Sequence, residues 1–175
     1  MGSTPKGVAA ARDSGIDLTL DGGLDGGVST YLGLHYHLIF SAKNREPWIV
    51  PSVRPRLHEY LGGVIHGLEG EPHGIGGTAD HVHLLITLAS THRLSDFVRE
   101  LKKASSIWMS SEGKCRDFSW QEGYCALTVS PSGRNAVREY IANQEEHHRQ
   151  FSFQDELRTL LRKHNLEWDE RYVWD

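Results

Sequence analysis

The sequence predicts an α+β domain built on one antiparallel β-sheet with α-helices packed against it. Short runs of branched and aromatic residues are interleaved with longer segments whose apolar residues recur every three or four positions. Their order is strand, helix, strand, strand, helix, strand, helix, before a last helix, without the strict alternation of a doubly wound sheet. The first elements match the split strand–helix–strand plan, so we expect a ferredoxin-like architecture.

The elements of the first half have clear signals. Residues 34–40 carry aromatic and branched side chains and predict a strand. Residues 51–68 predict a helix that ends at the turn-forming residues 69–72. Residues 73–78 and 81–88 predict two strands joined by a tight turn. The apolar face of the helix is made of Val53, Leu57, Leu61, Val64, Ile65 and Leu68.

The second half shows the same kinds of signal. Residues 94–109 predict a helix, residues 120–129 a strand and residues 153–163 a final helix. Between the last two, residues 134–149 predict a helix that starts after Pro131-Ser132-Gly133. The inward face of the helix over 94–109 is made of Leu94, Phe97, Val98, Leu101, Ile107 and Trp108.

Residues 1–30 differ from the rest of the chain. They are rich in Gly, Ser, Thr and Asp and have no helical or strand periodicity. We expect them to form a flexible N-terminal extension. Residues 31–175 are then one domain that ends in a C-terminal helix and a short tail.

Composition argues against membrane and disulfide-rich classes. No apolar run approaches the roughly 20 residues needed to cross a bilayer, and no basic segment followed by an apolar core indicates a secretory signal. The two cysteines, Cys115 and Cys125, form neither a disulfide framework nor a paired zinc-binding spacing. We therefore expect a cytoplasmic protein with no membrane partner.

The net charge of −4 argues mildly against nucleic-acid binding, because proteins that bind phosphates tend to be basic. Residues 1–30 contribute four aspartates against Lys6 and Arg12, which leaves −2 for the rest of the chain. Any DNA site must therefore be a local basic patch or depend on a bound cation.

A pair of histidines gives the strongest local signal. His81 and His83 lie two residues apart on a predicted strand and therefore point to the same face, while Val82 points to the other. Two neutral imidazoles in this arrangement can hold a metal ion. Two surface histidines on a half-exposed strand are the alternative. His35 and His37 share a face of another predicted strand, and we expect them to be structural.

A tyrosine and an amide form the second signal. Tyr140 and Gln144 lie four residues apart on a predicted helix and share a face of it. A packed tyrosine beside a solvated amide is the alternative. His147 and His148 follow one turn later, but neighbouring helical residues point about 100° apart, so we expect that both cannot serve one site.

Together these residues suggest metal-assisted attack by a tyrosine on a phosphodiester. A free phenol has a pKa of about 10 and is a weak nucleophile at neutral pH. A cation held by His81, His83 and Gln144 would polarise the phosphate and stabilise the charge of the transition state. A bond from Tyr140 to DNA would conserve energy for rejoining the strands. Imidazole ligands by themselves favour Mn²⁺ or Zn²⁺.

Five segments carry a resemblance to a known family: residues 37–43, 78–85, 101–106, 120–124 and 140–148. In this combination and order, the chain resembles the HUH single-strand DNA transposases with one catalytic tyrosine. This is the insertion-sequence-200-like family, which includes the REP-associated tyrosine transposases. The resemblance covers about residues 31–150.

The resemblance implies a ferredoxin-like fold, Mg²⁺ or Mn²⁺ held by His81, His83 and Gln144, and a 5′-phosphotyrosine intermediate on Tyr140. It implies a transposase that cleaves and rejoins single-stranded DNA at hairpin-bearing ends. It also implies a homodimer whose active sites are shared between subunits. A domesticated single-strand endonuclease, a non-catalytic single-strand nucleic-acid-binding module and a phosphodiesterase that uses water remain alternatives.

Basic residues after the first strand and on the second helix are candidates for DNA contacts. Such groups usually position phosphates rather than read sequence. A solvated charged face is the alternative, because Asp96 and Glu100 lie on the same helix. Trp120 and Tyr124 could stack on unpaired bases or pack in the core. The basic candidates are Lys43, Arg45, Arg99, Lys102 and Lys103.

Overall fold

Four strands form one antiparallel sheet in the order β2-β3-β1-β4. They are β1 (His35–Ser41), β2 (Glu71–Gly77), β3 (His81–Thr87) and β4 (Cys125–Val129). The computed structural model describes residues 31–174, so the expectation for residues 1–30 concerns positions outside this range. The predicted α+β, ferredoxin-like sheet is confirmed.

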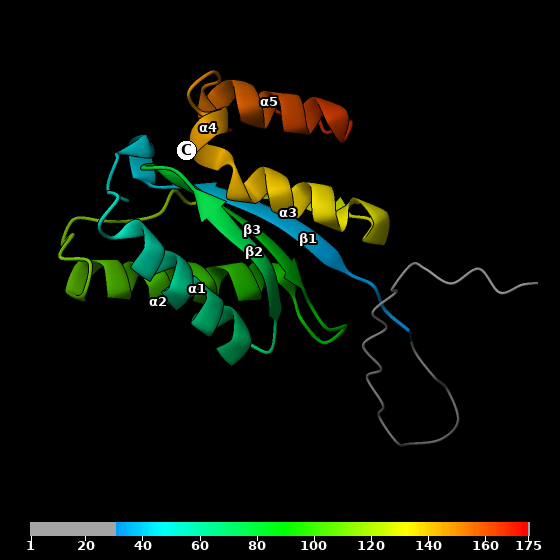
Figure 1. Ribbon diagram of the computed structural model, residues 1–175, viewed down its shortest axis with the longest axis horizontal. Coiled ribbons are helices and arrows are strands. Elements are labelled where there is room, and N and C mark those ends of the chain that lie inside the picture. Colours follow the sequence, from blue (N-terminus) through cyan, green and yellow to red (C-terminus); the bar gives the residue numbers. More distant parts are fainter. Residues whose placement is uncertain (1–30, 175) are drawn as a thin grey trace, which may run out of the picture.

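Helices cover both faces of the sheet (Figure 1). On one face lie α1 (Arg54–Gly67) and α2 (Leu94–Ser111). On the other lie α3 (Arg134–Ala142), α4 (Gln144–His147) and α5 (Phe153–Lys163). Two short 3-10 turns, η1 (Lys43–Arg45) and η2 (Pro131–Gly133), follow β1 and β4. Within the described range, no helix is both long enough and apolar enough to span a membrane.

Side-chain alternation along β3 divides the sheet into two environments. Val82, Leu84 and Ile86 are fully buried in the core that α1 and α2 complete. His81 and His83 are also fully buried, but they point to the opposite face. The predicted alternation is therefore confirmed, and the histidines lie under the C-terminal helices rather than in solvent.

A second apolar cluster fixes α5 on the histidine-bearing side of the sheet. Ile39 of β1 and Leu127 of β4 contact the buried stripe of α5, which comprises Phe153, Leu157 and Leu161. Because these residues recur every four positions, about one helical turn, they share one face of α5, and that face docks on the sheet.

The helix predicted over residues 134–149 is broken in the structure, so this prediction is wrong. Asn143 leaves helical geometry with φ −101° and ψ 21° and separates α3 from α4. Its side-chain Nδ2 donates to the carbonyl oxygen of Glu139 at 2.9 Å, a local bond that favours a helix end. Tyr140 and Gln144 therefore lie on different helices.

The last strand is shorter than predicted, beginning at Cys125 rather than at Trp120. Lys102 of α2 donates through Nζ to the three carbonyl oxygens of residues 121–123 at 2.5–3.2 Å. These carbonyls are thereby turned away from strand pairing, and Trp120 forms only an isolated bridge with Ala42.

The end of α3 lies unusually close to β2. A Cβ atom at Gly76 would lie 2.1 Å from the carbonyl oxygen of Ile141. Real Cβ atoms do not approach a backbone oxygen this closely, so only glycine permits the contact. The close approach positions the Asn143 break beside the edge of the sheet.

We expect Gly76→Ala to destabilise the fold by about 1–3 kcal/mol, because the methyl group must displace the backbone of α3. Gly63→Ala is the matched control, since a Cβ there meets no atom within 4 Å and the exposed position lies inside α1. Alanine in a helix interior should stabilise by about 0.5–1 kcal/mol. Urea unfolding measures the free energy of unfolding of both variants. A Gly76→Ala variant as stable as the Gly63→Ala variant would contradict the close contact between β2 and α3.

Candidate active site

His81 is oriented by polar groups at the start of β3. Its Nδ1 lies 2.7 Å from Oδ1 of Asp80 and 3.0 Å from the hydroxyl of Thr78. A carboxylate on Nδ1 fixes the ring and leaves Nε2 as the atom that faces the interior. This is how histidines that bind metals are usually held.

His83 is oriented by a histidine of β1. Its Nδ1 lies 2.9 Å from Nε2 of His37, while its own Nε2 is buried without a hydrogen-bond partner among the described residues. Burial lowers the pKa of His83 to about 4 and that of His37 to about 3. Both rings are therefore neutral at pH 7, the form in which imidazole binds a metal. His37 supports the site, in keeping with its expected structural role.

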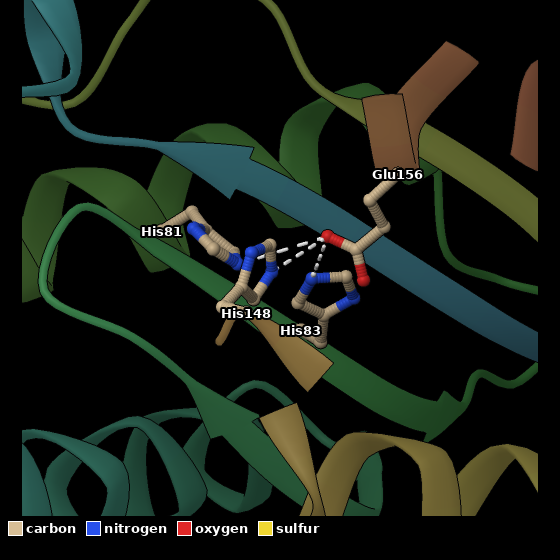
Figure 2. A group of neighbouring side chains, drawn as sticks. All are labelled: His81, His83, His148 and Glu156. Atoms are coloured by element: carbon tan, nitrogen blue, oxygen red, sulfur yellow. Dashed lines mark hydrogen bonds and ion pairs between the residues drawn. The ribbon is translucent and has the colours of Figure 1, made fainter. Parts of the chain in front are cut away.

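A carboxylate from α5 meets these imidazoles. Glu156, only 4% exposed, places Oε2 at 3.4 Å from Nε2 of His83 and 3.9 Å from Nε2 of His81. Nε2 of His148, at the end of α4, lies 3.0 Å from the same oxygen (Figure 2). The four ligand atoms all lie within 4.8 Å of one another and could hold a metal ion.

The second oxygen of Glu156 joins Tyr140 and Gln144 to this cluster. The Tyr140 hydroxyl donates to Oε1, and Nε2 of Gln144 donates to it at 2.9 Å. Oε1 of Gln144 lies 3.4 Å from Nε2 of His81. The break at Asn143 therefore does not separate the four residues of the two sequence motifs, because they converge on Glu156.

Burial and charge act in opposite directions on the two acidic groups. Burial alone would raise the pKa of Glu156, but the hydrogen bond from His148 and the His83 imidazole hold it well below its usual range. Burial and the adjacent Glu156 charge raise the pKa of Tyr140. In this arrangement the phenol is protonated at neutral pH and donates its proton in a hydrogen bond.

The sequence motifs missed Glu156 and gave no definite role to His147 and His148. These two histidines were expected not to serve one site, yet Nε2 of His147 lies 3.8 Å from Oε1 of Glu156 and Nε2 of His148 lies 3.0 Å from Oε2, with α4 ending between them. Glu156 had one usable signal: it lies on the apolar stripe of α5 between Phe153 and Leu157. A carboxylate on such a stripe must be paired when the helix docks.

A pocket of about 550 Å³ opens beside the tyrosine, between β4, α3 and α5. Tyr140, His147 and Glu156 line its inner end, and Phe151 and Lys163 lie nearer its outer wall. The pocket therefore connects the Tyr140 side of the cluster with solvent.

The basic residues predicted to contact DNA lie in two separate places. Lys43 is exposed in η1, next to Ala42, whose amide donates to the Asp80 carbonyl at 2.7 Å. Arg45 ends the same turn. The three basic residues on α2 lie on the sheet face opposite the histidines (Figure 1). These three are Arg99, Lys102 and Lys103, and they line a separate pocket of about 300 Å³ with Trp120 and Tyr124.

The three basic side chains of α2 make different contacts. Arg99 pairs with Asp96 at 2.6 Å and with Glu100 at 3.2 Å, as a solvated charged face would. The amine of Lys102 is engaged by backbone carbonyls, and burial lowers its pKa to about 8. Lys103 is exposed.

We expect Lys102→Met to lower the free energy of unfolding by about 1.5–3 kcal/mol, because it removes charge-assisted hydrogen bonds from residues 121–123. Lys103→Met, one residue along, should change stability by less than about 0.5 kcal/mol. Chemical denaturation measures both. A stable Lys102→Met variant would show that the loop does not depend on the lysine.

The fold and the convergence of Tyr140 with His81 and His83 define an enzyme class, that of single-tyrosine DNA-processing proteins built on an antiparallel sheet. Residues 30–144 match the family described as "Transposase IS200 like". The chain belongs to this family of transposases, enzymes that cleave DNA and transfer its strands. The matched stretch ends before His148 and Glu156.

Relatives agree with this assignment. The chain is 33% identical over 121 residues to the ISDra2 transposase TnpA of Deinococcus radiodurans, a match that covers 65% of this chain and 85% of the relative. A crystal structure described as that of a transposase from Deinococcus radiodurans R1 has a TM-score of 0.54 and 30% identity, over 69% of this chain and 98% of that one. A REP-associated tyrosine transposase bound to a REP hairpin shares the fold, with a TM-score of 0.53 and 16% identity, over 71% and 74% of the two chains.

Proposed function

We propose that this chain is a metal-dependent transposase that cleaves and rejoins single-stranded DNA at hairpin-bearing ends through a 5′-phosphotyrosine intermediate on Tyr140. The observation that carries the proposal is the convergence of the Tyr140 hydroxyl with Nε2 of His81 and His83 around one buried carboxylate. Tyr140 is the catalytic nucleophile in this proposal.

The proposed cation is Mg²⁺ or Mn²⁺, with His81, His83 and Gln144 as ligands. Nε2 of His83 is buried and, among residues 31–174, has no hydrogen-bond partner, and the Asp80 carboxylate turns Nε2 of His81 inward; both features fit a metal ion. A bound cation would neutralise charge that develops on the phosphate. The nitrogen donors suit Mn²⁺ better than Mg²⁺, which prefers oxygen.

Tyr140 would attack phosphorus, forming a bond between the tyrosine oxygen and the 5′-phosphate while the bond to the 3′-oxygen breaks. The phenol loses its proton, and the departing 3′-oxygen gains one and becomes a hydroxyl. The hydrogen bond to Glu156 holds the tyrosine oxygen at the site, and the 550 Å³ pocket gives a nucleotide room beside it. Attack by the 3′-hydroxyl on the phosphotyrosine reverses these bonds and rejoins the strand.

Single-stranded DNA with a hairpin is the proposed partner. The structural neighbour bound to a REP hairpin supports this choice. Lys43, Arg45 and Lys103 are proposed to contact phosphates. Arg99 and Lys102 were predicted to do the same and remain proposals, although both are already engaged by protein groups. A domesticated endonuclease would use the same site, whereas a non-catalytic binding module would not need its tyrosine.

We expect the wild-type chain, given Mn²⁺ and a labelled hairpin oligonucleotide, to form a covalent adduct visible on a denaturing gel. Tyr140→Phe should abolish the adduct and reduce cleavage by at least about 10³-fold, since phenylalanine has no hydroxyl oxygen with which to attack phosphorus. His81→Ala should lose the adduct while retaining DNA binding.

Tyr60→Phe is the matched control, because Tyr60 of α1 stacks on Trp108 of α2, on the sheet face opposite the histidines. It should form the adduct normally. Cleavage that persists in Tyr140→Phe without an adduct would favour a phosphodiesterase that uses water.

The family resemblance predicts a homodimer with active sites shared between subunits, whereas the contact of Tyr140 with Glu156 of the same chain favours a complete site within each subunit of such a dimer. Complementation distinguishes the two arrangements. Tyr140→Phe and His81→Ala are each inactive alone, and in shared sites one subunit would supply the missing group to the other. Because Tyr140 contacts Glu156 of the same chain, we expect no restoration of the adduct when the two variants are mixed. Restored adduct would show that the sites are shared.

A further inference from the structure

We propose that Glu156, together with His148, completes the cation site formed by His81 and His83, so that α5 contributes a metal ligand. This inference rests on the proposed function, since it concerns the same cation. The residues come from three parts of the chain: β3, the end of α4, and α5 (Figure 2). His148 and Glu156 lie beyond residue 144, where the match to the family ends.

Donor spacing supports the assignment. Oε2 of Glu156 lies 3.0 Å from Nε2 of His148, 3.4 Å from that of His83 and 3.9 Å from that of His81. Neighbouring ligand atoms around an octahedral ion such as Mg²⁺, with bonds of about 2.0–2.1 Å, lie about 3 Å apart. The separations from Oε2 of Glu156 lie at this value or up to about 1 Å above it, and all four ligand atoms lie within 4.8 Å of one another, so side-chain shifts would place them on one ion.

The buried negative charge of Glu156 also supports its assignment as a metal ligand. The Glu156 side chain is 2% exposed, and no lysine or arginine among residues 31–174 forms an ion pair with it. Its ion-pair partners are imidazoles only. Burying a carboxylate costs several kcal/mol unless it is paired, and a divalent cation between Glu156 and the strand histidines would add positive charge to these imidazole contacts.

Hydrogen bonds to the other oxygen, Oε1, hold the Glu156 carboxylate in an orientation suited to binding a cation. Oε1 accepts hydrogen bonds from Gln144 and Tyr140, which leaves Oε2 directed toward the histidines. Glu156 thus connects the proposed nucleophile to the cation through one rigid group. Gln144 then has two possible contributions, as a ligand through its oxygen and as the donor that orients Glu156 through its nitrogen.

Another role for Glu156 would be purely structural, as a buried partner of His148 that anchors α5. The two roles differ in what the carboxylate does when Mn²⁺ is present. A ligand changes the affinity for Mn²⁺ when it is removed, whereas an anchor changes only the stability of the fold.

Mn²⁺ binding to the full chain, without DNA, tests the inference. The chain is freed of metal and titrated with Mn²⁺, and the free ion is measured by electron paramagnetic resonance. We expect one Mn²⁺ per chain, a Kd at least about tenfold weaker in Glu156→Gln, and a weaker Kd in His148→Gln. Glu146→Gln is the control, because this exposed carboxylate of the same region pairs with Arg149 at 2.8 Å and should bind Mn²⁺ within twofold of wild type.

Thermal unfolding with and without Mn²⁺ gives an independent readout, since a bound ion raises Tm and the loss of a ligand reduces that rise. It also shows whether Glu156→Gln is folded; if it is not, His148→Gln carries the test. Wild-type affinity in the folded variant would overturn the inference and leave His81 and His83 as the site. Absence of Mn²⁺ binding in wild type would overturn the cation of the proposed function and this inference together.

Discussion

Strand β3 imposes the constraint on which the rest of the molecule depends, because it must present apolar side chains to one face of the sheet and imidazole side chains to the other. Val82 and Leu84 fill the core beneath α1 and α2, while His81 and His83 face the other helices. A slip of one residue would exchange the two sets and bury imidazoles against leucines. Pairing with β1 on one side and β2 on the other fixes the register against such a slip.

The histidine face needs a cover that is apolar at its margins and polar at its centre. Helix α5 provides both, since Phe153, Leu157 and Leu161 pack against the sheet while Glu156 points into the imidazoles. Apolar burial supplies the docking energy, and the carboxylate selects the orientation of the helix. The same contact brings Tyr140 to its partner, so packing and chemistry are joined at one residue.

The sequence allowed the antiparallel sheet, the chain order of most elements and the two faces of β3 to be predicted, because periods of two and of three to four residues are local properties. The break at Asn143 could not be predicted, because it accompanies a close contact with Gly76 on a strand far away in sequence. The sequence around Lys102 predicted a surface side chain, but its amine donates to backbone carbonyls nineteen to twenty-one residues away in sequence. Glu156 belongs to no motif and acquires its environment only when α5 docks.

The near-neutral domain is compatible with a DNA-processing enzyme if charge is concentrated at the site rather than spread over the surface. Glu156 carries negative charge into the interior, where histidines and a cation can balance it. Under the proposed function, basic groups such as Lys43 and Lys103 would need only to position the DNA.

The docking of α5 also bears on where this enzyme can be shortened. A fragment cut at residue 144 would keep the whole stretch that matches the family, with His81, His83, Tyr140 and Gln144. It would nevertheless uncover Ile39 and Leu127, which α5 shields, and would lack the carboxylate that holds Tyr140. Such a fragment would expose an apolar sheet face and would therefore tend to aggregate. A shortened form of the enzyme should keep all of α5 and extend at least to Lys163.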